Sequence, residues 1–208
     1  SAPGPCRRAS GPSLPSLLEH VTSSPFADRR IALVLGGGGL KGFAHIGVLR
    51  ALAERGVVPT RYAGTSIGAL IGAATVGGMS TDEMATRAMA LKRKDLFRIN
   101  HFGMLLERMR SASIYLEEPL RHLVESVVPD AAFTQLEKPL LVNTVDLEHG
   151  VQVVWGLPGL DGVNVRDAVY ASCALPGYFP PGKVGERFCI DGGAIDNLPV
   201  NIAALAYG

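Results

Sequence analysis

The sequence is poor in cysteine and has almost no net charge. Its three cysteines, Cys6, Cys173 and Cys189, lack the Cys-x-x-Cys or Cys/His spacing of a zinc site. We therefore expect a reduced, cytosol-like compartment and no metal site. Twenty Lys and Arg residues balance nineteen Asp and Glu residues, which gives a net charge of +1. Proteins that bind DNA or RNA usually carry a basic excess, so we expect no nucleic-acid partner.

Long uncharged runs are also scarce, and only residues 62–81 are long enough to cross a bilayer as a helix. Several glycines interrupt this run, and Gly64, Thr65 and Ser66 near its start have the composition of a turn. We therefore expect it to lie in a protein core. The sequence as a whole predicts a cytoplasmic protein.

The chain divides into a tail and one domain. Residues 1–29 are rich in proline and serine, which predicts a tail or linker. From residue 30 onwards, apolar runs typical of strands alternate with helical patterns. We expect strands near 31–35, 57–63, 140–146, 151–155 and 188–190, and helices near 43–53, 67–76, 80–91, 164–174 and 199–207. This order predicts a three-layer α/β/α domain with a mainly parallel central sheet.

Two segments of this domain, 30–208, raise further expectations. A helix that returns over a parallel sheet usually leads to another strand, so we expect the domain to be truncated after the helix at 199–207. Residues 91–129 interleave basic and apolar side chains, which predicts a helical, partly mobile cap. Within it, residues 92–110 could contact a membrane peripherally or could form a solvated charged face.

The strongest catalytic signal is the G-x-S-x-G sequence at 64–68, between a predicted strand and a predicted helix. In such an elbow, the central serine lies on a strained turn, and Gly64 and Gly68 give the backbone the room it needs. Ser66 could instead simply cap the following helix. The strand before it and the helix after it favour a nucleophile.

A serine nucleophile needs a base, and the usual hydrolase order places an acid and then a histidine after it. None of the five histidines follows Asp191. His149 could act out of order, or a histidine could lie beyond Gly208. Asp191 is the better candidate, because it ends a predicted strand and the glycines Gly192 and Gly193 leave its carboxylate accessible. As a base it would need a dry pocket that raises its pKa; otherwise the segment is an ordinary turn.

A glycine-rich loop at 36–42 follows the first predicted strand. It satisfies G-x-G-x-x-G, but no acid stands about twenty residues later to bind a ribose, and only Arg61 supports an NADP site. A Walker A loop is excluded, because Lys41 is followed by Gly42 where Ser or Thr is required. The loop's backbone amides suit an anion, which in a serine acyl enzyme is the tetrahedral oxyanion.

Together, the three motifs resemble the patatin-like phospholipase family, in its bacterial branch akin to the catalytic domain of neuropathy target esterase. The resemblance covers about 30–208 and extends to the sequence at 43–49, 171–180 and 197–200. It implies a Ser–Asp dyad without histidine, in which Ser66 is the nucleophile and Asp191 accepts its proton. It also implies a role for the glycine loop and the motif glycines: Gly37, Gly38 and Gly39 as oxyanion donors, Lys41 and Gly42 in the same substrate-binding loop, and Gly64, Gly68, Gly192 and Gly193 as motif positions.

The resemblance therefore implies a serine lipid acyl hydrolase of the phospholipase A or lysophospholipase type. It would cleave phospholipids, lysophospholipids or other fatty-acyl esters through an acyl-enzyme, without a metal or an organic cofactor. Two alternatives stay open. One is an acyltransferase at the same site, and the other is a non-catalytic domain that binds a lipid or a nucleotide.

Overall fold

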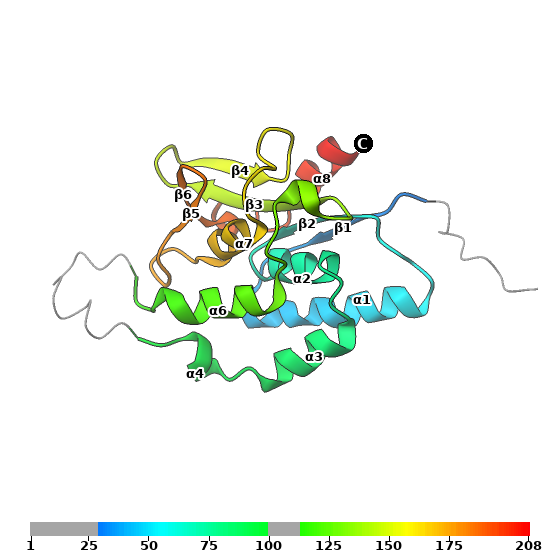
Figure 1. Cartoon of the computed structure of the whole chain (residues 1–208), viewed down its shortest axis with the longest axis horizontal. Helices are drawn as coiled ribbons and strands as arrows, with labels where there is room; N and C mark the ends of the chain where they lie inside the picture. The colour runs from blue at the N-terminus through cyan, green and yellow to red at the C-terminus, as the bar shows by residue number, and fades with distance from the viewer. Residues whose placement is uncertain (1–28, 100–112) are drawn as a thin grey trace, which may run out of the picture.

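A computed structural model describes residues 29–99 and 113–208 (Figure 1). The predicted tail, apart from its last residue, lies outside this range, as do Cys6, His20, His101 and most of the segment expected to contact a membrane. The tail at 1–29 and the membrane contact through 92–110 therefore remain predictions.

The elements follow one another as strands and helices along the described chain. They are β1 (Ala32–Leu35), the 3-10 helix η1 (Gly39–Phe43), α1 (Ala44–Glu54), β2 (Arg61–Thr65), α2 (Ile67–Val76), α3 (Thr81–Ala90), α4 (Arg93–Leu96), α6 (Glu117–Val127), η2 (Phe133–Gln135), β3 (Leu140–Asp146), β4 (Val151–Trp155), α7 (Val165–Cys173), β5 (Gly182–Val184), β6 (Arg187–Asp191), η3 (Gly192–Ala194) and α8 (Val200–Tyr207). The predicted bounds of α2, β3 and β4 are confirmed. The uncharged run at 62–81 forms most of β2, a turn, α2 and the segment that leads into α3.

The six strands form one mixed sheet. β1, β2 and β3 are parallel, as predicted, with Leu35 beside Gly64 and Thr65 beside Asn143. β3 also pairs antiparallel with β4 along one edge, and with β6 along the end of the edge that it shares with β2. β5 then pairs antiparallel with β6. The sheet is therefore less parallel than predicted. Tight turns join β3 to β4 and β5 to β6, which makes these two pairs antiparallel, and β6 also runs antiparallel to β3.

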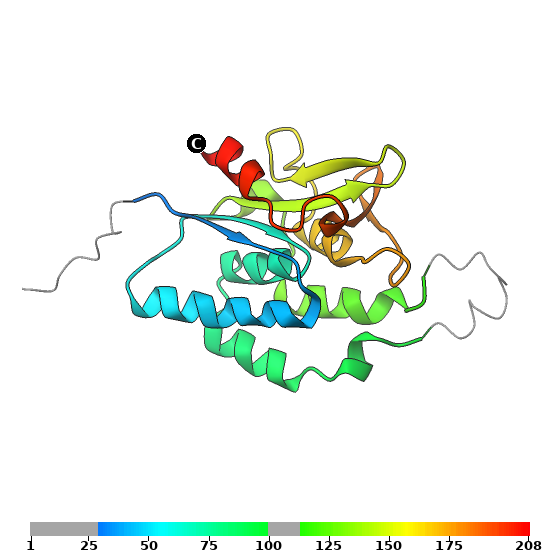
Figure 2. The same ribbon diagram turned by 180° about the vertical axis from the view of Figure 1, so that it is seen from behind.

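Helices cover both faces of the sheet, which confirms the three-layer α/β/α class (Figures 1 and 2). Because strand residues alternate in direction, Tyr62 and Val142 join the larger core, while Ala63 and Leu141 join a smaller cluster under α8. On the larger side, α2 and α7 pack directly against the strands. α1 and α6 lie beyond them, and α3 and α4 form the outermost part of the molecule (Figure 1).

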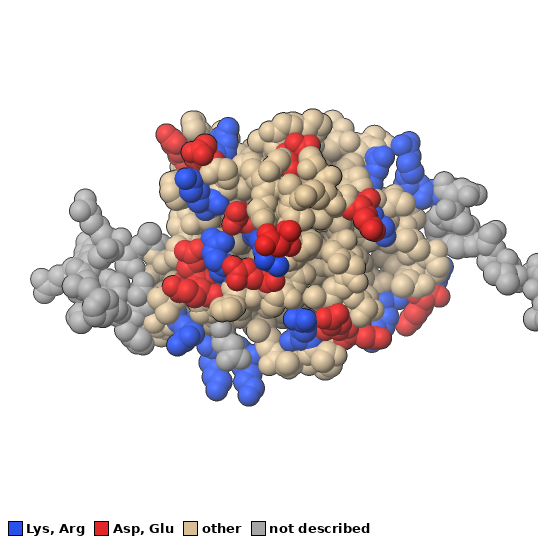
Figure 3. All heavy atoms as spheres, in the orientation of Figure 1, with Lys and Arg blue, Asp and Glu red and all other residues tan. Residues whose placement is uncertain are grey.

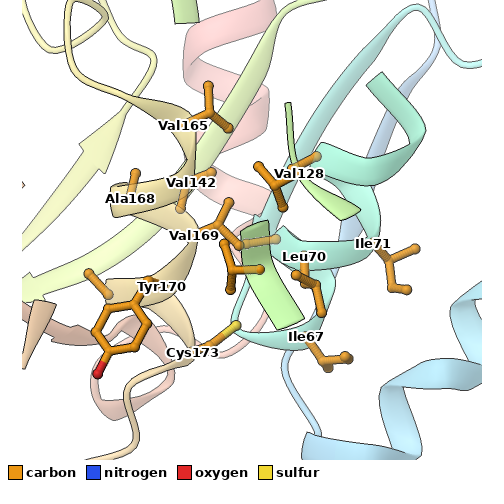
Figure 4. Close-up of a cluster of buried hydrophobic side chains, with 14 of the residues drawn as sticks. Ile67, Leu70, Ile71, Val128, Val142, Val165, Ala168, Val169, Tyr170 and Cys173 are labelled. Carbon is orange, nitrogen blue, oxygen red and sulfur yellow. The ribbon is translucent and has the colours of Figure 1, made fainter. Parts of the chain in front are cut away.

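The larger core fixes the start of α2 against α7. Ile67 and Leu70 of α2 lie near Val169 and Cys173 of α7, and all four side chains are buried (Figure 4). Close packing of this kind leaves little freedom at the junction between β2 and α2. The fold therefore holds the residue at that junction, Ser66, in a fixed position.

Acidic and basic side chains alternate on the face shown in Figure 3. Several are paired, as Arg87 with Glu83 and Arg121 with both Glu117 and Asp167. Over the ranges 29–99 and 113–208, no helix is long and apolar enough to cross a membrane.

Candidate active site

Ser66 occupies the turn between β2 and α2. Its backbone has φ 56° and ψ −127°, and among the described residues it is the only non-glycine residue with a positive φ. Such a conformation costs about 1–3 kcal/mol and persists only where the surroundings enforce it. Ser66 stands at the N-cap position of α2, but its side chain makes no capping hydrogen bond. Capping therefore does not explain the serine.

The two glycines of this elbow allow α2 to lie against the ends of β1 and β2. A Cβ at Gly68 would lie 2.1 Å from the carbonyl oxygen of Leu35, and a Cβ at Gly64 would lie 2.6 Å from the amide nitrogen of Ala69. Neither backbone atom can move away without breaking the packing. The G-x-S-x-G spacing therefore reflects close approach of a helix to two strands.

Asp191 ends β6 and faces the elbow from the neighbouring part of the sheet. It pairs with Thr144 of β3, and its amide donates to the carbonyl of Ala174 just after α7 (3.0 Å). Its side chain is only 2% exposed, and its Oδ1 accepts a hydrogen bond from the Gly193 amide (2.8 Å). The structure thus brings Ser66 and Asp191 together, with the Ser66 side chain interacting with the carboxylate.

Burial dominates the ionisation of this carboxylate. It raises the pKa of Asp191 above its ordinary value of 3.8, although the Ser66 side chain and the Gly193 amide act in the opposite direction. A higher pKa makes the carboxylate a better proton acceptor than an exposed aspartate.

The glycine loop runs beside this pair and is held there by Asn197. The amide of Gly37 donates to the Asn197 carbonyl (2.9 Å), and Asn197 Nδ2 donates to the Gly37 carbonyl (3.3 Å). A Cβ at Gly37 would lie 3.3 Å from the Cβ of Ser66, and one at Gly193 would lie 3.0 Å from Asn197 Oδ1. The three sequence motifs therefore meet at one place. Because the Gly37 amide already donates to Asn197, it is not free to bind an oxyanion, and Gly38 and Gly39 remain as the predicted donors.

The remaining loop residues have different environments. Lys41 is exposed, whereas Gly42 is buried, and a Cβ there would collide with Ile67 at the start of α2. A Cβ at Gly192 would lie 2.5 Å from the Asn143 carbonyl oxygen. Gly42 and Gly192 therefore permit close packing around the elbow.

Sequence reasoning missed two residues that hold the elbow, Ser172 and Asn143. The Ser66 amide donates to Ser172 Oγ (2.8 Å), and Ser172 Oγ donates to the Asn143 carbonyl (2.7 Å). Asn143 Nδ2 in turn donates to Thr65 Oγ1 (3.1 Å) and to the Asp196 carbonyl (2.7 Å). These bonds join the nucleophile turn to the segment that follows Asp191. Ser172 and Asn143 are single polar residues outside the three motifs. Ser172 does lie within 171–180, a segment included in the family resemblance.

Of the three described histidines, two have partners other than the Ser66–Asp191 pair and the third is exposed. His149 Nδ1 lies 3.0 Å from Asp146 Oδ2, at the turn between β3 and β4. His45, on α1, has its Nε2 2.9 Å from the Gly36 carbonyl oxygen, and His122 is exposed on α6. Among the residues that the structure describes, no group of three or more His, Cys, Asp or Glu side chains is arranged to hold a metal ion.

Within residues 29–99 and 113–208, Asp146 is a second carboxylate with a shifted pKa. It is 1% exposed, and its Oδ2 lies 2.5 Å from Arg187 Nη1. Burial opposes its ionisation, but hydrogen bonds from Arg187, His149 and the amides of Glu148 and His149 lower its pKa to about 2. This cluster fixes the β3–β4 hairpin.

An apolar cavity of about 80 Å³ opens beside Ser66, and we call it the active-site cavity. Its walls come from the glycine loop and η1, α2, α4, α6, the end of α7 and the segments after α4 and α7: Gly39, Leu40, Phe43, Ser66, Ile67, Leu70, Leu96, Phe97, Leu120, Leu123, Cys173, Leu175 and Phe179. Apart from Ser66, the side chains around it are almost all hydrocarbon. A hydrocarbon ligand would therefore fit this cavity better than a polar one.

The chain belongs to the patatin-like phospholipase family, whose family model matches residues 33–204. This confirms the resemblance drawn from the three motifs. Membership of the family supports a lipid acyl hydrolase.

Individual relatives agree with this assignment. An uncharacterized NTE family protein of Mycobacterium tuberculosis is 35% identical over 189 residues, which cover 91% of this chain and 48% of the relative. The patatin-like phospholipase domain-containing protein 7 of Rattus norvegicus is 34% identical over 175 residues, or 83% of this chain and 12% of that protein. The chain thus spans about half the length of the mycobacterial relative.

A solved structure shares the fold. The crystal structure of VipD from Legionella pneumophila matches with a TM-score of 0.58 and 19% identity, over 82% of this chain and 47% of that one.

Proposed function

We propose that this chain is a serine lipid acyl hydrolase of the phospholipase A or lysophospholipase type, in which Ser66 is the nucleophile and Asp191 the base. The observation that supports this most is the strained Ser66 turn against a buried carboxylate with a raised pKa. If only the shape of this turn mattered, glycine would adopt the positive φ without strain. A serine held there at a cost in strain supports a role for its hydroxyl group.

In the proposed reaction, Asp191 takes the hydroxyl proton as Ser66 Oγ attacks the carbonyl carbon of a fatty-acyl ester. The amides of Gly38 and Gly39 donate to the resulting oxyanion, and each such donor typically contributes about 3 kcal/mol. The C–O bond to the alcohol breaks, and the alcohol leaves with the proton from Asp191. The product is an ester between Ser66 and the fatty acid.

Water completes the cycle. Asp191 takes a proton from a water molecule, whose oxygen attacks the acyl carbon, and the proton passes to Ser66 Oγ as the acyl–serine bond breaks. The fatty acid is released and both residues return to their starting state. The active-site cavity, lined by Leu70, Leu120 and Phe179 among others, would hold the acyl chain.

Release of fatty acid tests this proposal. The purified chain would be incubated with phosphatidylcholine, lysophosphatidylcholine and p-nitrophenyl acyl esters, and the freed acid or nitrophenol measured. We expect Ser66→Ala and Asp191→Asn each to lower the rate by at least about 10³-fold. Ser126→Ala on the exposed end of α6 and Asp161→Asn in the β4–α7 loop are the matched controls and should keep the wild-type rate.

Two outcomes would count against it. Full activity in Ser66→Ala would remove the nucleophile from the scheme. Acyl transfer to an added alcohol, with little free fatty acid formed, would favour the acyltransferase alternative.

A further inference from the structure

Three cavities meet at Leu123 of α6. The first is the active-site cavity. The second, which we call the inner cavity, measures about 30 Å³ and lies among α1, α2, α3 and α6, with Ile46, Ile71 and Met84 in its walls. The third, the outer cleft, measures about 350 Å³ and lies between α4 and α6. Leu123 lines all three.

The two neighbours of the active-site cavity differ in chemistry. The inner cavity has hydrocarbon walls except for Arg87, which is held by Glu83 (2.9 Å) and the Ser126 carbonyl (3.2 Å). The outer cleft has the charged or polar side chains of Arg98, Glu118 and His122 in its lining. A hydrocarbon chain that outgrows the active-site cavity would therefore extend into the inner cavity, because each buried methylene is favourable there.

Three side chains separate the active-site cavity from the inner cavity, and they are fixed to different degrees. Phe43, Leu70 and Leu123 line both. Leu70 is 3% exposed within the core of α2, and Phe43 ends η1 directly after the glycine loop. Leu123 is only half-buried and lies on α6, which bears none of the three motifs. It is therefore the part of the wall that can vary without disturbing the elbow.

The helix that bears Leu123 is anchored. Arg121 bonds Glu117 on α6 and Asp167 on α7 (2.6 and 3.1 Å), and its guanidinium lies 4.4 Å from the ring centre of Tyr170. With the backbone of α6 held against α7, the size of the side chain at position 123 decides how far the active-site cavity extends.

We propose that Leu123 sets the length of the acyl chain that the enzyme accepts, by closing the active-site cavity against the inner cavity. This inference rests on the proposed function, because it takes Ser66 as the point where the acyl chain begins. A short chain would end before Leu123, whereas a longer chain would meet it.

The test compares p-nitrophenyl butanoate with p-nitrophenyl dodecanoate through the ratio of their kcat/KM values. Leu123→Ala joins the two cavities, so we expect the dodecanoate/butanoate ratio to rise about tenfold. Leu123→Phe fills the passage, and the same ratio should fall about tenfold. Leu160→Ala is the matched control: Leu160 is also half-buried against the core but lines none of the three cavities, and its ratio should match that of wild type.

The ratio is independent of the fraction of each variant that folds, because both esters report on the same active molecules. The proposed function is tested separately by butanoate hydrolysis, which should occur in the wild-type chain and be lost in Ser66→Ala. If that hydrolysis occurs and both Leu123 variants keep the ratio within twofold of wild type, the inference is overturned and the proposed function stands. If the wild-type chain hydrolyses neither ester, both fail together.

Discussion

Replacing Ser172 by alanine removes the side chain that holds the nucleophile turn. Ser172 is fully buried, accepts the amide proton of Ser66 and donates to the carbonyl of Asn143. Without the hydroxyl, the Ser66 amide is a buried donor without this acceptor, which costs about 1–3 kcal/mol. The Asn143 carbonyl loses one bond, worth about 1 kcal/mol. We therefore expect Ser172→Ala to lower the free energy of unfolding by about 2–4 kcal/mol.

The same change should loosen the nucleophile. The φ of Ser66 is strained, and the Ser172 bond is one of the contacts that hold it. A displacement of about 1 Å at a reacting group can cost about 10²-fold in rate. We expect the rate of ester hydrolysis per folded molecule to fall by about 10- to 100-fold.

Urea unfolding measures the stability, and hydrolysis of p-nitrophenyl butanoate measures the rate under conditions where the variant is folded. Ser126→Ala is a chemically identical change at an exposed position on α6 and should shift stability by less than about 0.5 kcal/mol. The reasoning is refuted if Ser172→Ala matches Ser126→Ala in both stability and rate.

Three further changes probe the packing and the buried carboxylates. Gly68→Ala should lower the free energy of unfolding by about 3 kcal/mol, because its Cβ meets a backbone carbonyl. Gly47→Ala, at an exposed position within α1 where a Cβ meets nothing, should raise it by about 1 kcal/mol, and urea unfolding checks both. Asp191→Asn should be more stable than wild type near neutral pH, and the difference should shrink as pH falls through the raised pKa of Asp191, reaching its minimum near pH 3.8. Burial raises the pKa of Asp191 in the folded state, so the wild-type protein loses stability as pH rises through that pKa. A difference in unfolding free energy between wild type and Asp191→Asn that stayed constant across pH would contradict this. Asp146 stabilises the fold above its ordinary pKa of 3.8 and loses that contribution as pH falls towards about 2, and Arg187 is one cause of this low pKa. Arg187→Ala should therefore unfold at a higher pH in an acid titration followed by circular dichroism. An unchanged midpoint would contradict this prediction.

The parts of the fold with strong local patterns could be predicted from the sequence. α2, β3 and β4 have the predicted bounds, because a small-residue helix after an elbow and two apolar runs around a Gly150 turn are distinctive patterns. The helix expected near 80–91 is present as α3, and Ser80 Oγ accepts from the Glu83 amide at its start (3.2 Å), at the Ser-x-x-Glu spacing typical of a helix start.

Other parts left no local signal. β5 has only three residues, too few for a periodic pattern, and its pairing with β6 was not foreseen. Helix α6 begins at Glu117, and its N-cap residue Leu116 makes no side-chain capping hydrogen bond, so its start was not recognised within the segment 91–129.

The candidate site was predictable at its motifs but not in its support. Ser66, Asp191 and the glycine loop each stand in a motif whose spacing has a physical reason. Ser172 and Asn143 act through bonds to residues 106 and 29 positions away in the sequence, and a single serine or asparagine reveals nothing of such contacts. The hydrogen bond from the Gly37 amide to Asn197 likewise joins residues that are 160 positions apart in the sequence.

A fluorophosphonate probe tests the proposed pair most directly, because it forms a covalent bond only with an activated serine. The adduct would be mapped by mass spectrometry in the wild-type chain, in Asp191→Asn and in the control Asp161→Asn. We predict an adduct on Ser66 that is lost in Asp191→Asn and retained in Asp161→Asn. An adduct on Ser66 that forms equally fast in Asp191→Asn, or none on Ser66 in a folded wild-type sample, would contradict the Ser66–Asp191 dyad.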